Sequence, residues 1–315
     1  MSKKIFAKAV SIVCAALLLA VLAWGVAGVL SPGVSALAEK YEAGEAEISG
    51  TVRNLDIDWI SGKVHIIYHS GNGIRLRESA ARAIPKDQQM IWRLDGDTLR
   101  IQYEKAGFHL FRFTSLQKEL TLELPEGISL NNVSISVTSG EMDIPSLWTD
   151  SLRLEATSGD IRAAAAAKDV TIETTSGDVM FGLSGNAQAL SIHSTSGNVL
   201  LRADSVDKAV FDSTSGSIQA ELQSSKKVTA NSTSGDLSVT LSAMDTLKID
   251  TTSGNVSLFL HEAPGFTARF DTVSGSIQYE LPLLKRGADY VCGDGSGTLQ
   301  VSTTSGNIRV NASDR

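Results

Sequence analysis

Apolar and polar residues alternate in short segments on either side of a corner that recurs along most of this chain. The corner is Thr-Ser-Gly, with Val273 replacing the threonine in one copy. Successive corners lie 18 to 21 residues apart, except for a last step of 31. A period of about twenty residues is typical of a repeat protein. The Ser-Gly pairs of this turn motif are Ser139 and Gly140, Ser158 and Gly159, Ser176 and Gly177, Ser196 and Gly197, Ser215 and Gly216, Ser234 and Gly235, Ser253 and Gly254, Ser274 and Gly275, and Ser305 and Gly306.

Four apolar columns accompany the motif, at four and six residues before each serine and at three and five residues after it. Alternation with a period of two on both sides of a corner indicates two short strands per turn, each with one face turned inward. The column three residues after the serine is Met142, Ile161, Val179, Val199, Ile218, Leu237, Val256, Ile277 and Ile308. The next column is Ile144, Ala163, Phe181, Leu201, Ala220, Val239, Leu258, Tyr279 and Val310.

A single turn buries too little apolar surface to offset the conformational entropy that ordering it costs. Stacked turns give each strand parallel partners above and below, and they bury the four columns in one continuous core. The pattern therefore predicts an all-β fold, a single-stranded parallel β-solenoid with turns of about 19 residues. We expect a right-handed solenoid, because parallel crossover connections generally are right-handed.

The same offsets recur around Ser61, where Leu55, Ile57, Val64 and Ile66 occupy the inward positions. This early copy predicts that the solenoid begins near residue 50. We expect irregular first turns and a cap over residues 48–128, followed by the regular repeat over residues 129–315. End turns of a solenoid are atypical because they must cover the open core and the exposed strand edge.

Two segments interrupt the regular pattern. An insertion occupies residues 282–298, and we interpret its Gly-rich segment 292–297 as a hairpin turn that closes the solenoid. Within the irregular turns, an apolar cluster has two open interpretations, packing in the cap or a partner-binding patch. The cluster consists of Phe108, Leu110, Phe111 and Phe113.

The N-terminal residues 1–38 predict a signal-anchor or a signal peptide. Three lysines precede an uncharged apolar run over residues 9–30, which is long enough to cross a bilayer with the N-terminus in the cytoplasm. The sequence Ala36-Leu37-Ala38 has the small-residue pattern of a signal-peptidase site. Two hypotheses stay open: a single-pass membrane protein with its solenoid outside, or secretion after cleavage near Ala38. Residues 39–47 form a short polar stalk in both.

Charge and cysteine content narrow the function classes. The formal net charge of −7 includes +3 from the leading lysines, so the exported part carries −10. So acidic a surface argues against nucleic acid as a partner and against direct adsorption to anionic lipid. Cys14 lies in the apolar run and Cys292 lies near the other end, so no internal disulfide is expected. We expect Cys292 to be an ordinary, part-buried thiol.

The residue after each motif glycine is the main candidate for a site. The first three members of this column, Glu141, Asp160 and Asp178, are acidic and should stack about 4.8 Å apart, so that a bound cation would relieve their repulsion. The alternative is turn chemistry, in which Asp or Asn side chains bond to nearby backbone groups. Catalysis is the weakest interpretation, since the five histidines are dispersed and no metal, triad or cofactor motif is present. We expect no cofactor.

The Ser-Gly-Asp/Asn turns, the opening segment Asp58–Val64, the Leu124-Pro125 boundary and the closing segments Gly293–Ser296 and Thr304–Ile308 resemble a known family. It is the bacterial putative-adhesin domain of unknown function, also called the toastrack domain. The resemblance covers residues 48 to 312. It implies a membrane-tethered β-solenoid linked with phage-shock-like or cell-wall-antibiotic stress systems, and it supplies no catalytic residues.

Together these observations favour a non-catalytic, membrane-anchored solenoid outside the cell that binds or senses something in the envelope. The expected partner is a wall polymer, a membrane protein of a stress-response system or a second copy of the chain. The alternative is a polysaccharide-active β-helix enzyme, which would need a groove with convergent carboxylates.

Overall fold

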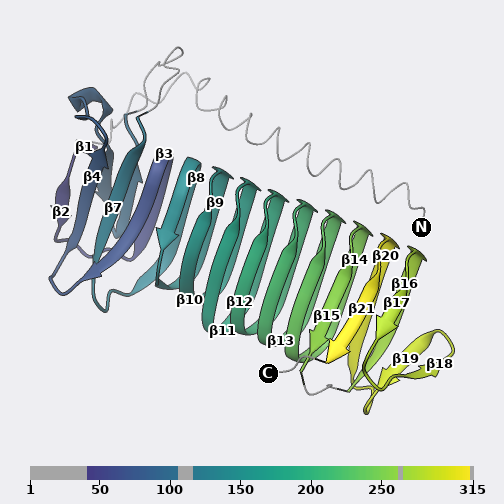
Figure 1. Cartoon of the computed structure of the whole chain (residues 1–315). Coiled ribbons are helices and arrows are strands. Elements are labelled where there is room, and N and C mark those ends of the chain that lie inside the picture. Colours follow the sequence, from purple (N-terminus) through teal and green to yellow (C-terminus); the bar gives the residue numbers. More distant parts are fainter. Residues whose placement is uncertain (1–40, 106–115, 262–264, 313–315) are drawn as a thin grey trace, which may run out of the picture. The chain divides into compact units, whose positions relative to one another are not determined.

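The computed structural model describes residues 41–105, 116–261 and 265–312, which belong to one unit of the chain. This unit is built almost entirely from β-strands, stacked one against the next (Figure 1). Within these ranges no helix has the length and apolarity needed to cross a bilayer. The predicted membrane segment 9–30, the cleavage site at Ala38 and the apolar cluster from Phe108 to Phe113 lie outside the described residues.

The middle of the unit consists of long strands that each cover most of one turn. Neighbours pair in parallel and in register, so that Ser158 pairs with Ser176 and Ser176 with Ser196. This register confirms the predicted parallel stacking of turns, while the handedness stays a prediction. The strands are β8 (Leu130–Ile144), β9 (Trp148–Ser158), β10 (Ile161–Ser176), β11 (Val179–Ser196), β12 (Val199–Ser215), β13 (Ile218–Ser234) and β14 (Leu237–Ser253).

The motif glycines form a column in which successive backbones approach closely. Gly177 has φ of 125°, and a Cβ atom built on it would lie 2.1 Å from the carbonyl oxygen of Gly159 in the preceding turn. Any side chain there would collide with backbone that cannot move aside. The glycine of the turn motif is therefore required by the stacking itself.

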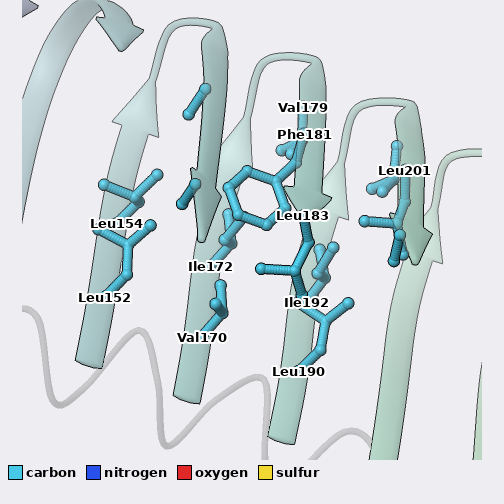
Figure 2. Close-up of a cluster of buried hydrophobic side chains, with 14 of the residues drawn as sticks. Leu152, Leu154, Val170, Ile172, Val179, Phe181, Leu183, Leu190, Ile192 and Leu201 are labelled. Atoms are coloured by element: carbon cyan, nitrogen blue, oxygen red, sulfur yellow. The ribbon is translucent and has the colours of Figure 1, made fainter. Parts of the chain in front are cut away.

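The core is the set of four apolar columns that the sequence predicts. Figure 2 shows Leu154, Ile172 and Ile192 facing inward from successive turns, and all three side chains are buried. The four inward positions around Ser61 are buried as well, which confirms the early copy of the turn. Two predicted inward positions differ: Ile277 is only partly buried and Tyr279 is 42% exposed. Both lie in the outermost turn, where no further turn covers them.

The N-terminal end does not follow the order of the sequence. The first turn, β3 (Asn54–His69), pairs with β8 on one side and with β6 (Thr98–Gln102) and β7 (Lys118–Pro125) on the other. It therefore lies one turn inside the end of the stack (Figure 1). Antiparallel strands cover the outer edges of β6 and β7. β4 (Ile74–Ala80) pairs with β7 and β5 (Ile91–Asp95) with β6, and a short 3₁₀ helix η1 (Lys86–Gln88) lies between β4 and β5. Two further antiparallel strands, β2 (Ala46–Ile48) and β1 (Glu42–Ala43), pair in turn with β4 and β5.

The C-terminal end repeats this arrangement. The last turn, β20 (Gly297–Ser305) and β21 (Ile308–Ala312), inserts between β14–β15 on one side and β16–β17 on the other. The stack thus places Ser253, Ser305 and Ser274 in that order, not in the order of the sequence. The flanking strands are β15 (Val256–Leu260), β16 (Phe266–Ser274) and β17 (Ile277–Tyr279).

The insertion at 282–298 contains a hairpin of β18 (Leu284–Arg286) and β19 (Asp289–Cys292), and β19 pairs antiparallel with β16. Its tip is at Gly287, where φ is 64°. The prediction that the Gly-rich segment 292–297 is the hairpin turn was wrong, since that segment connects β19 to β20. Cys292 is 2% exposed, so it is more fully buried than expected.

Candidate functional site

The column after the motif glycine forms a ladder of side chains on the surface of the corner. The Oδ1 atom of Asp160 accepts a hydrogen bond from the backbone N–H of Asp178 at 3.0 Å, and Asp178 accepts one from Asn198 at 2.8 Å. The pattern continues past the inserted last turn, where the N–H of Asn307 donates to Asn255 and that of Ser276 donates to Asn307. Each Asp or Asn side chain thus binds the next turn in the stack.

The three predicted cation ligands all have protein partners. The guanidinium of Arg162 lies 3.5 Å from Glu141 and 3.1 Å from Asp160, and Asp178 binds Asn198 through both its backbone and side-chain amides. No group of three or more potential ligand side chains is placed to hold a metal within the described ranges. These contacts agree with the turn interpretation, and the cation site at Glu141, Asp160 and Asp178 stays a prediction.

A shallow groove of about 550 Å³ crosses the strands on an outward face. We call it the cross-strand groove. It runs from the start of β9 over β10 to β14 and reaches the residue after β15. The outward side chains that line it are Ser146, Trp148, Ala164, Ala166, Gly182, Ser184, Arg202, Asp204, Glu221, Gln223, Thr240, Ser242 and His261.

Small residues form the floor of the groove at its β10–β11 end. Ala164 pairs with Gly182 in register, and both are half-buried. A Cβ atom on Gly182 would find only the Cβ of Ala164, at 3.6 Å, so the space above this glycine is open. The depression exists because two neighbouring turns carry almost no side chain at this outward position.

Trp148 forms the wall at the same end. The side chain of Trp148 is 54% exposed, which is unusual for a large apolar residue in this protein. Its ring packs against that of Tyr68 on β3, with centroids 5.5 Å apart and an interplanar angle of 62°. This edge-to-face contact fixes the orientation of the indole while leaving one face toward solvent.

Charged groups in the groove are engaged with each other or with backbone. Arg202 Nε lies 3.1 Å from Glu221 Oε2 in the next turn. Asp204 accepts a hydrogen bond from the N–H of Gly185 at 2.9 Å. Both groove carboxylates therefore have partners within the protein.

The histidines stay dispersed, and His193 illustrates their role. It lies on β11 with Nδ1 3.0 Å from Asp212 Oδ2 and Nε2 2.8 Å from the hydroxyl of Ser191. The hydrogen bond to Asp212 raises the pKa of His193, although burial acts in the opposite direction. This pair links two turns across the outer surface and leaves the groove untouched.

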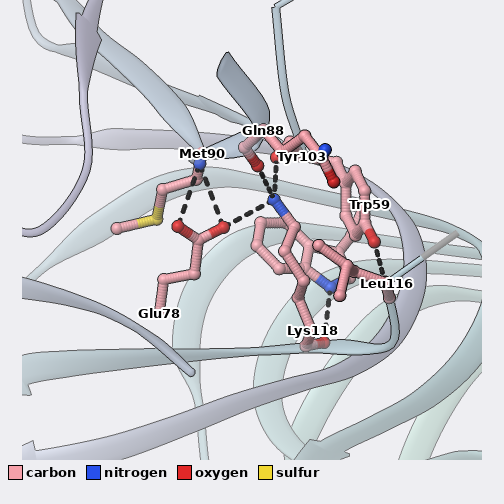
Figure 3. Close-up of polar contacts among 7 residues, drawn as sticks. All are labelled: Trp59, Glu78, Gln88, Met90, Tyr103, Leu116 and Lys118. Carbon is pink, nitrogen blue, oxygen red and sulfur yellow. Dashed lines mark hydrogen bonds and ion pairs between the residues drawn. The ribbon is translucent and has the colours of Figure 1, made fainter. Parts of the chain in front are cut away.

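A second polar cluster lies buried at the N-terminal end (Figure 3). The ammonium of Lys118 is fully buried and contacts the Glu78 carboxylate at 2.6 Å, where Glu78 is itself only 3% exposed. It also donates to the carbonyl oxygens of Gln88, at 2.7 Å, and Tyr103. All three ammonium protons therefore have acceptors.

Aromatic rings enclose this lysine. Its nitrogen lies 3.8 Å from the ring centroid of Tyr103 and 5.2 Å from that of Trp59, and the Trp59 indole donates to the Lys118 carbonyl at 3.1 Å. Burial lowers the pKa of Lys118, and the contact with Glu78 opposes that shift. With every donor used and no solvent access, the cluster fastens β4, β7 and the segment after β6 together.

Sequence reasoning missed both the groove and this cluster. The only sequence signal for the groove is a run of small residues at outward positions, Ala164, Ala166 and Gly182, beside a tryptophan outside the four inward columns. The buried lysine has no such signal, because its partners come from three separate segments of the irregular region.

The fold and the ladder of corner residues define this protein as a parallel β-solenoid with antiparallel strands added at both ends. The chain belongs to the Toastrack DUF4097 family, whose family model matches residues 52–311. No curated protein matches the sequence.

Three solved structures match the chain at low similarity. A "putative adhesin" from Bacteroides fragilis is 15% identical, covers 88% of this chain and 98% of its own, and has a TM-score of 0.42. A "putative lipid binding protein" from Parabacteroides distasonis is 14% identical with the same coverage and a TM-score of 0.38. A "putative cell adhesion protein" from Clostridium sporogenes is 11% identical, covers 87% and 100%, and has a TM-score of 0.22. At these values no functional conclusion follows from them.

Proposed function

We propose that this protein is a non-catalytic, adhesin-like binding module of the bacterial cell envelope, anchored in the cytoplasmic membrane with its solenoid outside. The observation that carries the proposal is the cross-strand groove, with the exposed ring of Trp148 beside a floor of small residues. A concave surface with an apolar wall and a few polar groups is the usual form of a binding site.

The state of the groove carboxylates supports binding over catalysis. Glu221 is held by Arg202 and Asp204 by the backbone of Gly185, so neither is placed as a free general acid or base. Polysaccharide cleavage by this protein is therefore the result that would overturn the proposal.

The membrane anchor and the stress-response connection come from the sequence. The apolar run 9–30 after three lysines supports an anchor, and the alternative is release after cleavage near Ala38. The resemblance to envelope stress proteins supports a wall polymer or a membrane protein of that system as partner. A second copy of the chain, paired through the open edge of the outermost turn, is another partner that the proposal includes.

Two measurements test the proposal with the full-length chain. Fractionation of cells together with protease accessibility should place the solenoid outside the membrane and keep it membrane-bound. Isolated cell-wall sacculi and envelope membranes should then retain the protein, and Trp148→Ala should reduce that retention. The proposal would be overturned if neither the sacculi nor the envelope membranes retained the native chain, or if the native chain shortened wall glycan.

A further inference from the structure

We infer that the cross-strand groove binds an uncharged linear glycan that lies across the strands, with a sugar ring stacked on Trp148. This inference rests on the proposed function and names the class of ligand for the same groove. Four features of the groove lead to it: the exposed indole, the open floor, the balance of charge and the direction in which the groove runs.

The indole of Trp148 is suited to a sugar face. It is more than half exposed, yet its contact with Tyr68 holds the ring in one orientation. A pyranose ring presents apolar C–H groups on its faces and hydroxyls around its rim. A fixed aromatic ring next to hydrogen-bonding groups matches both properties, whereas an acyl chain would cover those polar groups without offering them any hydrogen bond.

Polar side chains continue along the groove from this platform. The Arg202–Glu221 pair, Gln223 and Thr240 lie beyond the floor, in the three turns that follow β11. Together they offer both donors and acceptors, which hydroxyl groups require. The single arginine is matched by Glu221 and accompanied by Asp204, so the groove offers no excess positive charge to an anionic polymer.

The direction of the groove excludes an added peptide strand. The backbones of β10 to β14 pair with neighbouring turns along most of their length, with short breaks at groove positions such as Asp204 and Gln223, so the groove offers no continuous strand edge for a peptide to pair with. The groove crosses the strands and spans six strand spacings from β9 to β15, roughly 29 Å at about 4.8 Å each. An extended β-linked glycan advances by a similar distance per sugar, so successive sugars can meet equivalent positions of successive turns.

Calorimetric titration of the full-length chain in detergent with cellohexaose and chitohexaose tests the inference. We expect one of these neutral hexasaccharides to bind, with affinity that rises from the disaccharide to the hexasaccharide. Trp148→Ala should weaken binding at least tenfold. Gly182→Phe should do the same by filling the floor, since its Cβ would meet only the Cβ of Ala164, at 3.6 Å.

Met180→Ala supplies the matched control. Met180 is 53% exposed on the outward face of β11, but it does not line the groove, so its loss should leave binding unchanged. Circular dichroism of each variant separates loss of binding from loss of folding, and Trp148→Phe should retain part of the affinity in a folded protein.

Several outcomes would overturn the inference. Equal binding by Trp148→Ala, Gly182→Phe and the native chain would place the glycan elsewhere. Binding of a hyaluronan hexasaccharide or of phosphatidylglycerol vesicles, with no binding of neutral glycan, would show that the ligand class is wrong. If sacculi still bind in a Trp148-dependent way in that case, the proposed envelope function stands. If neither sacculi nor membranes bind, the proposed function falls as well.

Discussion

Replacing Lys118 by alanine should loosen the N-terminal end of the stack while leaving the middle intact. The substitution removes the cationic partner of a Glu78 carboxylate that is 3% exposed and, among the described residues, leaves it only the backbone N–H of Met90 as donor, and it removes the donor to the carbonyl oxygens of Gln88 and Tyr103. Breaking a buried ion pair from one side costs about 3–5 kcal/mol. The energy of each turn of a solenoid depends mainly on its neighbours, so the loss should stay local.

Hydrogen exchange followed by mass spectrometry measures this directly. At about 1.4 kcal/mol per tenfold change, the substitution should speed exchange in β4 and β7 by roughly 100-fold to several thousandfold. Exchange in β12 and β13 should stay at the native rate. A single unfolding temperature would not serve, because a long repeat array need not unfold as one unit.

Two further variants make the reasoning refutable. The double variant Lys118→Met with Glu78→Gln carries no buried charge, and it should recover part of the lost protection. Lys168→Ala removes an exposed ion pair with Asp150 at 2.7 Å and should change nothing measurable. The ion pair does not hold this end together if Lys118→Ala exchanges at the native rate in β4 and β7. The same conclusion follows if the double variant exchanges faster there than either Lys118→Met or Glu78→Gln alone.

Three other predictions concern the corners and the outer surface. Asp178→Ala should cost roughly 1 kcal/mol by removing the bonds to the next turn, whereas Asp178→Asn should be tolerated; hydrogen exchange in β11 and β12, with and without calcium, checks this, and slower exchange of the native chain alone with calcium would support the cation site instead. Gly177→Ala should cost about 3 kcal/mol or more, because its Cβ meets backbone at 2.1 Å; Gly185→Ala, which has open space, should cost about 1 kcal/mol in the same exchange assay. Because the folded pKa of His193 is raised above 6.5, its pairing with Asp212 should stabilise the protein fully below that pH and should fade as the pH rises through the folded value; a His193→Gln variant whose stability follows the same pH profile between pH 5 and 9 would contradict this.

The sequence predicted the interior of the stack because its signal is local. Each motif serine fixes four nearby inward positions, and positions such as Ile172 and Val179 alternate within a few residues of it. The same local pattern identified the turn around Ser61, although 78 residues separate it from the next motif serine.

The order of the turns at both ends could not be predicted in this way. Every turn presents the same four apolar columns, so the pattern allows any turn to stack on any other. What places β3 next to β8, and β20 next to β14, is pairing between residues far apart in the sequence. The groove was missed for a related reason, since Trp148 and Gly182 belong to outward columns that pattern analysis treats only as surface.

The position of β20 and β21 between turns that come earlier in the sequence also affects how the stack assembles. Without residues 297–312, the turn formed by β16 and β17 has no parallel turn to pair with. The edge of β14 that pairs with β20 is then accessible to proteases. A chain shortened before residue 297 would therefore lose two turns of the stack, although it would lack only the residues of one.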